Sequence, residues 1–171
     1  MLIICRFYMF GRRIAHTFFR ALSDMLPLQE LRSCYLSAEF TPAESEWHPL
    51  IQQSKNVTAL VVSNRLADSF ADALATLAPT YPYPRLQYLK IENGTFIQNG
   101  QESSLGGALC AGLRGIDRSL TLSLQSCKIT EPYIESMKHH FALLEWDKAS
   151  GGDDEETEDN AQYGWFVEDR M

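Results

Sequence analysis

Residues 86–96 read LQYLKIENGTF, and residues 119–129 read SLTLSLQSCKI. The two stretches align without a gap, and apolar residues occupy three shared positions. A small residue, Gly94 in one stretch and Cys127 in the other, stands two places before the last of these positions. A short apolar alternation followed by a turn residue is typical of a strand that leads into a loop. The two stretches therefore predict two copies of one strand-and-turn unit.

Similar apolar runs recur along the chain. We expect strands at Leu28–Leu36, Val57–Val62, Leu86–Ile91, Leu120–Leu124 and Phe141–Trp146. The central inward residues are taken as Leu31, Val62, Ile91, Leu124 and Trp146, which lie 31, 29, 33 and 22 residues apart. A period near 30 is typical of a solenoid, in which each repeat adds one supersecondary unit, whereas a doubly wound sheet has no fixed period.

The segments between these runs carry helix signals, which are capping residues followed by apolar positions at helical spacing. We expect helices begun by the capping box Thr41-Pro42-Ala43-Glu44, by Asp68 (over 69–78), by Ser104 (over 105–114, ended by Gly115) and by Pro132 (over 133–140). Alternating helices and strands predict the α/β class, with parallel strands joined by crossover helices.

The strand units follow the pattern L-x-x-L-x-L-x-x-N/C-x-L to different degrees. The matches are Leu26, Leu31, Cys34 and Leu36; Val57, Leu60 and Val62, up to Arg65; Leu86, Leu89, Ile91 and Phe96; and Leu122, Leu124, Cys127 and Ile129. On these residues the chain resembles leucine-rich-repeat proteins of the ribonuclease-inhibitor-like kind over about residues 15–147. It resembles most closely the divergent arrays that follow the F-box in fungal F-box proteins.

The resemblance implies a short right-handed solenoid of four to five repeats, with parallel strands on a concave face and helices on the convex face. It also implies that Cys34 and Cys127 are buried thiols in the turn after their strands. The implied function is protein binding without catalysis, related to substrate recognition by ubiquitin ligases. Because an F-box is longer than the segment before the array, we expect a ubiquitin-ligase adaptor as a partner only if an F-box precedes this sequence.

Composition divides the chain into an N-terminal segment over 1–14, the array over 15–149 and an acidic tail over 150–171. The net charge is −7, but eight of the 22 acidic residues lie beyond residue 150, which leaves 14 residues of each sign before it. Without a basic stripe, nucleic-acid binding is not expected. The apolar opening is too short to span a bilayer, and Arg12 and Arg13 follow it rather than precede it, so we expect no membrane association and a cytoplasmic or nuclear location.

Two other functional interpretations stay open. Cys110 or Cys127 with His139 or His140 could form a cryptic thiol–imidazole site of a small α/β hydrolase-like enzyme. Against this, Cys110 lies in an apolar helical stretch, and paired histidines at the end of a helix often only complement its dipole, so we assign no catalytic residue, metal site or cofactor. The chain could also be a truncated gene product without a function of its own.

A glycine-rich stretch at Leu105-Gly106-Gly107-Ala108, with Gly112 beyond it, invites comparison with phosphate-binding loops. It has neither the G-x-x-x-x-G-K-[ST] order nor the G-x-G-x-x-G order. Small residues in a helix instead predict close packing against a neighbour.

The tail joins two kinds of sequence. Residues 150–160 read SGGDDEETEDN, whose charge and lack of apolar side chains predict disorder. An aromatic island over Tyr163–Val167 follows. This island could cover the end of the array, or it could bind a partner as a short linear motif.

Alternate strand residues point to opposite faces of a sheet, so the residues between the core positions should face a partner. The predicted partner-binding residues are Arg32, Ser33, Ser63, Asn64, Lys90, Glu92, Ser123 and Gln125. Their mixed polarity suits a protein surface better than a small apolar ligand.

Overall fold

The computed structural model describes residues 2–6, 24, 27–37, 41–80, 82–114 and 119–149, with residues 2–6 described by their backbone alone. Most of the N-terminal segment, Leu26, Gly115 and the whole tail lie outside these residues. The expectations placed on them, including those for the aromatic island, therefore rest on the sequence.

Six parallel strands form one sheet, and their order in the sheet is their order in the chain. They are β1 (Leu2–Arg6), β2 (Ser33–Ser37), β3 (Ala59–Ser63), β4 (Tyr88–Glu92), β7 (Thr121–Gln125) and β8 (Leu143–Trp146). Every adjacent pair is parallel. The predicted α/β class with parallel strands is confirmed.

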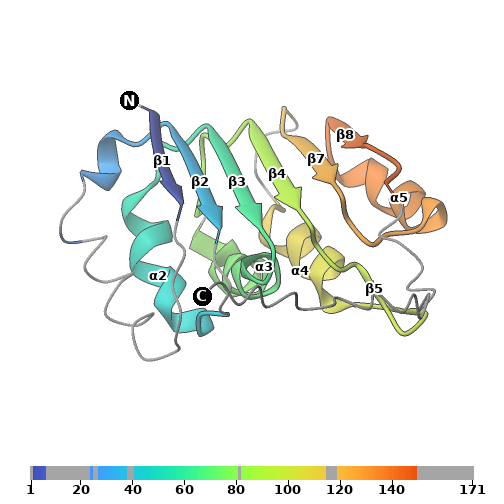
Figure 1. Ribbon diagram of the computed structural model, residues 1–171. Coiled ribbons are helices and arrows are strands. Elements are labelled where there is room, and N and C mark those ends of the chain that lie inside the picture. The colour runs from blue at the N-terminus through green and yellow to red at the C-terminus, as the bar shows by residue number, and fades with distance from the viewer. Residues whose placement is uncertain are drawn as a thin grey trace, which may run out of the picture.

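Helices α2, α3 and α4 cover one face of the sheet, and α5 lies against β8 at its end (Figure 1). Their bounds are Glu44–Gln53, Leu66–Leu77, Ser104–Gly112 and Glu131–Met137, with short 3-10 turns η1 (Leu28–Glu30), η2 (Ala78–Thr80) and η3 (Lys138–His140). Pro132 lies in the first turn of α5, as predicted. Among the described residues, no helix combines the length and the apolar character that crossing a membrane requires.

A small antiparallel hairpin, which the sequence did not lead us to expect, follows β4. Its strands are β5 (Ile97–Gln98) and β6 (Gln101–Glu102). Asn99 and Gly100 form the turn, with φ of 52° and 74°. Positive φ at both central residues is the conformation that an Asn-Gly hairpin turn requires.

The register aligns the inward side chains of successive strands. Cys34, Leu60, Leu89, Leu122 and Leu144 form one row, and Leu36, Val62, Ile91, Leu124 and Trp146 form the next. Leu36, and not the predicted Leu31, is therefore level with Val62. The separations along this second row are 26, 29, 33 and 22 residues.

The expectation for the first repeat is wrong by five residues. The 3-10 turn η1 occupies the first three residues of the expected strand Leu28–Leu36, and β2 begins only at Ser33. Cys34 consequently lies within β2 rather than in the turn after it, whereas Cys127 does follow its strand. In this register Cys34 and Leu36 are inward positions of β2, and both are buried.

The four later strands begin one or two residues after their predicted starts. Val57, Leu86, Leu120 and Phe141 are buried, but each precedes its strand. Because an apolar residue just before a strand contributes to the core like one inside it, apolarity alone does not locate the first hydrogen-bonded residue.

Helices α2 and α3 do not begin at their predicted caps. Ala43, not Thr41, is the N-cap of α2, because the carboxylate of Glu46 accepts a hydrogen bond from the backbone N–H of Ala43 at 2.8 Å. Helix α3 begins at Leu66, so Asp68 lies in its first turn instead of preceding it. Asp68 there complements the positive end of the helix dipole.

Ser103, not Ser104, caps α4. Its hydroxyl oxygen accepts from the N–H of Leu105 at 3.3 Å, and its hydroxyl donates to the carbonyl of Thr95 at 2.6 Å. The second bond ties the start of the helix to the loop after β4, and this explains why the earlier serine is used.

Glycines bring α4 close to its neighbours. A Cβ on Gly106 would lie 2.4 Å from the hydroxyl oxygen of Tyr133, and a Cβ on Gly112 would lie 2.6 Å from the Cβ of Leu74 in α3. Both distances are too short for any real side chain to occupy without a shift of its neighbour. The close-packing interpretation is confirmed for Gly106 and Gly112 but not for Gly107, where a Cβ would meet nothing within 4 Å.

Candidate functional site

The face of the sheet that turns away from the helices is covered by none of the described elements (Figure 1). Its strand residues alternate with the buried rows. We call it the open face, and its side chains are Ser33, Tyr35, Ser37, Ala59, Val61, Ser63, Tyr88, Lys90, Glu92, Thr121, Ser123, Gln125, Leu143 and Glu145. Of the predicted binding residues, Ser33, Lys90, Glu92, Ser123 and Gln125 lie here with accessible side chains.

The other three predicted residues are not accessible strand positions. Ser63 belongs to β3 but is 1% exposed, and its hydroxyl oxygen lies 3.5 Å from Nδ2 of Asn64. Arg32 lies just before β2, where its guanidinium donates to the carbonyl of Asn56 at 3.4 Å. Asn64 lies just after β3, with φ of 58°. Because β2 and β3 are only five residues long, Arg32 and Asn64 lie beyond the ends of the strands rather than within them.

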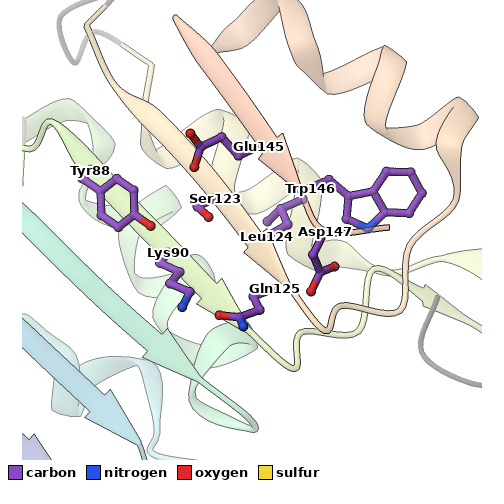
Figure 2. Close-up of a pocket in the computed structure, with 8 residues that line it drawn as sticks. All are labelled: Tyr88, Lys90, Ser123, Leu124, Gln125, Glu145, Trp146 and Asp147. Carbon is purple, nitrogen blue, oxygen red and sulfur yellow. The ribbon is translucent and has the colours of Figure 1, made fainter. Parts of the chain in front are cut away.

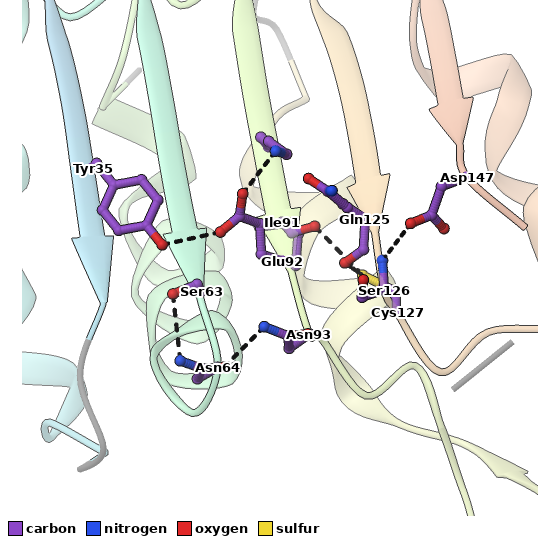
Figure 3. Close-up of polar contacts among 11 residues, drawn as sticks. Tyr35, Ser63, Asn64, Ile91, Glu92, Asn93, Gln125, Ser126, Cys127 and Asp147 are labelled. Atoms are coloured by element: carbon purple, nitrogen blue, oxygen red, sulfur yellow. Dashed lines mark hydrogen bonds and ion pairs between the residues drawn. The ribbon is translucent and has the colours of Figure 1, made fainter. Parts of the chain in front are cut away.

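A polar network crosses the open face from β2 to β4. The hydroxyl of Tyr35 donates to one carboxylate oxygen of Glu92 at 3.0 Å (Figure 3), and the ammonium of Lys90 lies 2.7 Å from the other. The hydrogen bond to Glu92 raises the pKa of Lys90, so the ammonium stays charged. With side chains only 23% and 19% exposed, this ion pair is partly shielded from water. Three side chains are thus held in place before any partner binds.

A shallow depression of about 310 Å³ lies beside this network, over β4, β7 and β8 (Figure 2). Its lining is Tyr88, Lys90, Ser123, Leu124, Gln125, Glu145, Trp146 and Asp147. Lys90, Ser123 and Glu145 are level across the three strands. Because the serine side chain is short, the longer side chains on either side stand above it and leave the hollow. The depression offers an ammonium, an amide and carboxylates beside a tyrosine ring.

Directly after three successive strands the backbone becomes left-handed. Asn64, Asn93 and Ser126 have φ of 58°, 55° and 52°. The N–H of Asn64 donates to the carbonyl of Glu92, and that of Asn93 to the carbonyl of Gln125, both at 2.9 Å. The side chains are joined too, because Nδ2 of Asn93 donates to Oδ1 of Asn64 at 3.1 Å (Figure 3). This row ties the end of each strand to the next one.

After β7 the N–H of the left-handed residue donates to a side chain instead of a main-chain carbonyl. The N–H of Ser126 donates to the carboxylate of Asp147 at 2.7 Å, where the pattern calls for a main-chain carbonyl (Figure 3). The other carboxylate oxygen accepts from the N–H of Ala149 at 3.0 Å. Beside the row lies a second hollow of about 270 Å³, lined by Asn64, Arg65, Asn93 and Thr95.

The pKa values of Cys127 and Cys110 are raised, whereas the pKa of a catalytic thiol is usually lowered. Burial raises the pKa of Cys127 to about 11, and its Sγ lies 3.4 Å from the carbonyl oxygens of Ile91 and Gln125. Burial also raises the pKa of Cys110. In the described part of the chain neither thiol is hydrogen-bonded to an imidazole, and no group of three or more His, Cys, Asp or Glu side chains is placed to hold a metal ion.

Several residues of the open face are missing from the sequence-based set. Tyr35, Tyr88 and Glu145 follow the same alternation as Lys90 and could have been found from it. Tyr35 was hidden because the first repeat was placed five residues away from its true register. The hydrogen-bonded row could also have been found from the sequence. Its members are polar residues two positions after an inward strand residue, namely Asn64, Asn93 and Ser126.

Comparison of the chain with family models, with curated proteins and with solved structures finds no match in any of the three.

Proposed function

We propose that this chain is a short leucine-rich-repeat-like solenoid that binds another protein on its open face and catalyses no reaction. The observation that carries the proposal is the open face itself, where tyrosine, amide and charged side chains stand preformed and uncovered by the described elements. Tyrosine is one of the residues enriched at binding hot spots between proteins. Strands that follow chain order, at separations of 26, 29, 33 and 22 residues, support the solenoid arrangement.

The resemblance to fungal F-box proteins extends the proposal to one biological role. In that role the open face recognises a substrate of a ubiquitin ligase in the cytoplasm or nucleus, and a ubiquitin-ligase adaptor is a partner only if an F-box precedes this sequence. The bound segment would lie across β4, β7 and β8, because the hollow of about 310 Å³ lies there.

An exchange of the two paired charges tests the proposal. Lys90→Glu combined with Glu92→Lys keeps the net charge and lets the ion pair re-form in the opposite direction. Because partly exposed ion pairs contribute at most about 1 kcal/mol, we expect the melting temperature to change by less than about 4 °C. Partner binding should nevertheless be lost, since complementary charges of the partner would then meet like charges. Loss of folding in the exchanged variant would contradict the assignment of these side chains to an open surface.

Photo-crosslinking in the source cell identifies the surface that the partner contacts. Benzoylphenylalanine replaces Tyr88 on the open face in one full-length variant and the exposed Asp72 of α3 in a matched control. We expect a protein that crosslinks to position 88, does not crosslink to position 72 and disappears when the two charges are exchanged. The same crosslinked proteins from both positions would refute binding on the open face.

A further inference from the structure

Among the described elements, β8 is less completely covered than the strands before it. This strand is the last in the described sheet, and it pairs on one side only, with β7. Leu122 and Leu124 of β7 are 0% and 1% exposed, whereas the inward residues of β8, Leu144 and Trp146, are only partly buried. Leu143 on the other face of β8 is 51% exposed. In a stacked array, the terminal unit needs a covering segment that its sequence or a partner must supply.

A hollow of about 200 Å³ marks the uncovered place, between β8 and α5. Ile134, Leu144 and Trp146 form its apolar part. The indole Nε1 of Trp146 is shielded from water, yet it has no hydrogen-bond acceptor among the described residues. A shielded N–H without an acceptor is unfavourable and rare, so an acceptor from outside the described residues is expected here.

We propose that the aromatic island of the tail, residues 163–167, reading YGWFV, adds an antiparallel strand to the free edge of β8 and covers this hollow. The island consists mainly of aromatic and β-branched residues, which favour strands. An exposed edge strand is the surface to which an extended segment adds most readily. This self-capping goes beyond the proposed function, because it leaves the open face free for a partner.

Alternation fits the two faces of β8. Tyr163, Trp165 and Val167 fall on one face of an added strand and Phe166 on the other. The first set covers the inward side chains of β8 and brings the Tyr163 hydroxyl as an acceptor for the unpaired indole N–H. Phe166 then lies on the open-face side, beside the exposed Leu143.

The connecting segment is long enough to allow the return. Residues 150–162 separate the island from the described chain, and 13 residues span at most about 45 Å when extended. The four residues of β8 extend over only about 13 Å. The covalent connection also gives the island an effective concentration of about a millimolar, so even weak pairing suffices in the same chain. This is why we assign the edge to the tail rather than to a second copy.

The charged lining of the hollow is balanced, and among the described residues it offers an acidic segment one unpaired cation, Lys148. The connecting segment holds six acidic residues. Lys138 and Lys148 line the hollow, and His139 and His140 follow Lys138. Two carboxylates, Glu131 and Glu135, line it as well, and Glu135 pairs with Lys138. Lys148 has no ion pair among the described residues and is the cation we expect the segment to meet.

Nuclear magnetic resonance of the full chain tests the proposal. The variant is Trp165→Ala with Phe166→Ala, and the matched control is Asn160→Ala with Gln162→Ala, also in the tail. In the island variant we expect the indole N–H signal of Trp146 to shift and the amides of β8 to exchange with solvent at least tenfold faster. The control should leave both unchanged. The signal of Trp146 is assigned with Trp146→Phe.

Three results would overturn the proposal. The first is an unchanged Trp146 signal together with unchanged exchange in β8. The second is an effect that appears only at high protein concentration, which would assign the edge to a second copy. The third is loss of a bound partner protein in the island variant while Trp146 is unaffected, which would make the island a linear motif.

Discussion

Asn93 holds a backbone conformation that most residues avoid, with φ of 55°. Alanine at this position keeps the strain of a left-handed conformation, whereas glycine relieves it, and both lose the side-chain donor to Asn64. We therefore expect Asn93→Ala to lower the free energy of unfolding by about 1 to 2 kcal/mol and Asn93→Gly to lower it by clearly less. Urea denaturation measures both. Equal losses would mean that the side-chain hydrogen bond, and not the backbone, matters at this position.

Cys127 links stability to alkaline pH. Its thiol loses its proton near the ordinary pKa of 9.0 in the unfolded chain but only near 11 in the folded one. Between these two pH values the unfolded state therefore binds fewer protons than the folded state. The contribution of the protonated thiol to the free energy of unfolding is fully present below pH 9 and is lost as the pH rises towards 11. Cys127→Ala should remove about 2 kcal/mol of that loss. Chemical denaturation of both proteins at pH 7 and pH 11 gives the comparison.

The same thiol separates the binding interpretation from the enzymatic one. A thiolate is the reactive form, and at neutral pH a buried thiol with a raised pKa supplies almost none. Iodoacetamide should leave Cys127 of the native protein unmodified at pH 7, as read by mass spectrometry of its peptides. Rapid modification would instead favour a cryptic thiol–imidazole site with His139 or His140.

At the scale of elements, two glycines of α4 form a matched pair. A Cβ on Gly112 would lie 2.6 Å from the Cβ of Leu74, whereas a Cβ on Gly107 would meet nothing within 4 Å. We expect Gly112→Ala to destabilise the protein by about 1 to 3 kcal/mol through overpacking. Gly107→Ala should stabilise it by up to about 1 kcal/mol, because alanine is the better helix former.

Thermal unfolding of the two variants distinguishes these effects by sign. Each kcal/mol corresponds to a shift of about 2 to 4 °C at this chain length. A gain in melting temperature for both variants would mean that α3 and α4 are not held as close as the two distances imply.

The elements differ in how well they could be predicted. Strands β4 and β7 could be predicted from alternation. Each has two inward residues two positions apart, Leu89 and Ile91 in β4 and Leu122 and Leu124 in β7, and turn residues follow each strand. The first repeat fails because Leu31, Cys34 and Leu36 fit the pattern in two registers. Only pairing with Leu60 and Val62 selects one, and that contact lies outside the repeat. The cap of α2 fails for a different reason, since Ala43 has no side-chain acceptor and so gives no capping signal in the sequence, although its N–H donates to Glu46.

At the scale of the whole molecule, the open face could be predicted only in part. Alternation along one strand says that Lys90 and Glu92 share a face, and it does so without the structure. It cannot say that Tyr35 reaches Glu92 across an intervening strand, nor that a short Ser123 between two longer side chains opens a hollow. Those features depend on the register between strands, which a single sequence leaves undetermined.

Asp147 offers a test of how the whole sheet holds together. It supplies the last acceptor of the hydrogen-bonded row, to the N–H of Ser126 at 2.7 Å. In a stacked array each unit is stabilised mainly by its neighbours, so damage at one end should remain local. We expect Asp147→Ala to cost about 1 kcal/mol and to speed hydrogen exchange in β8 while leaving β3 and β4 unchanged. Asp147→Asn keeps an acceptor oxygen and should change exchange less. Equal acceleration in all strands would show that the sheet opens as one unit, which would contradict the solenoid arrangement.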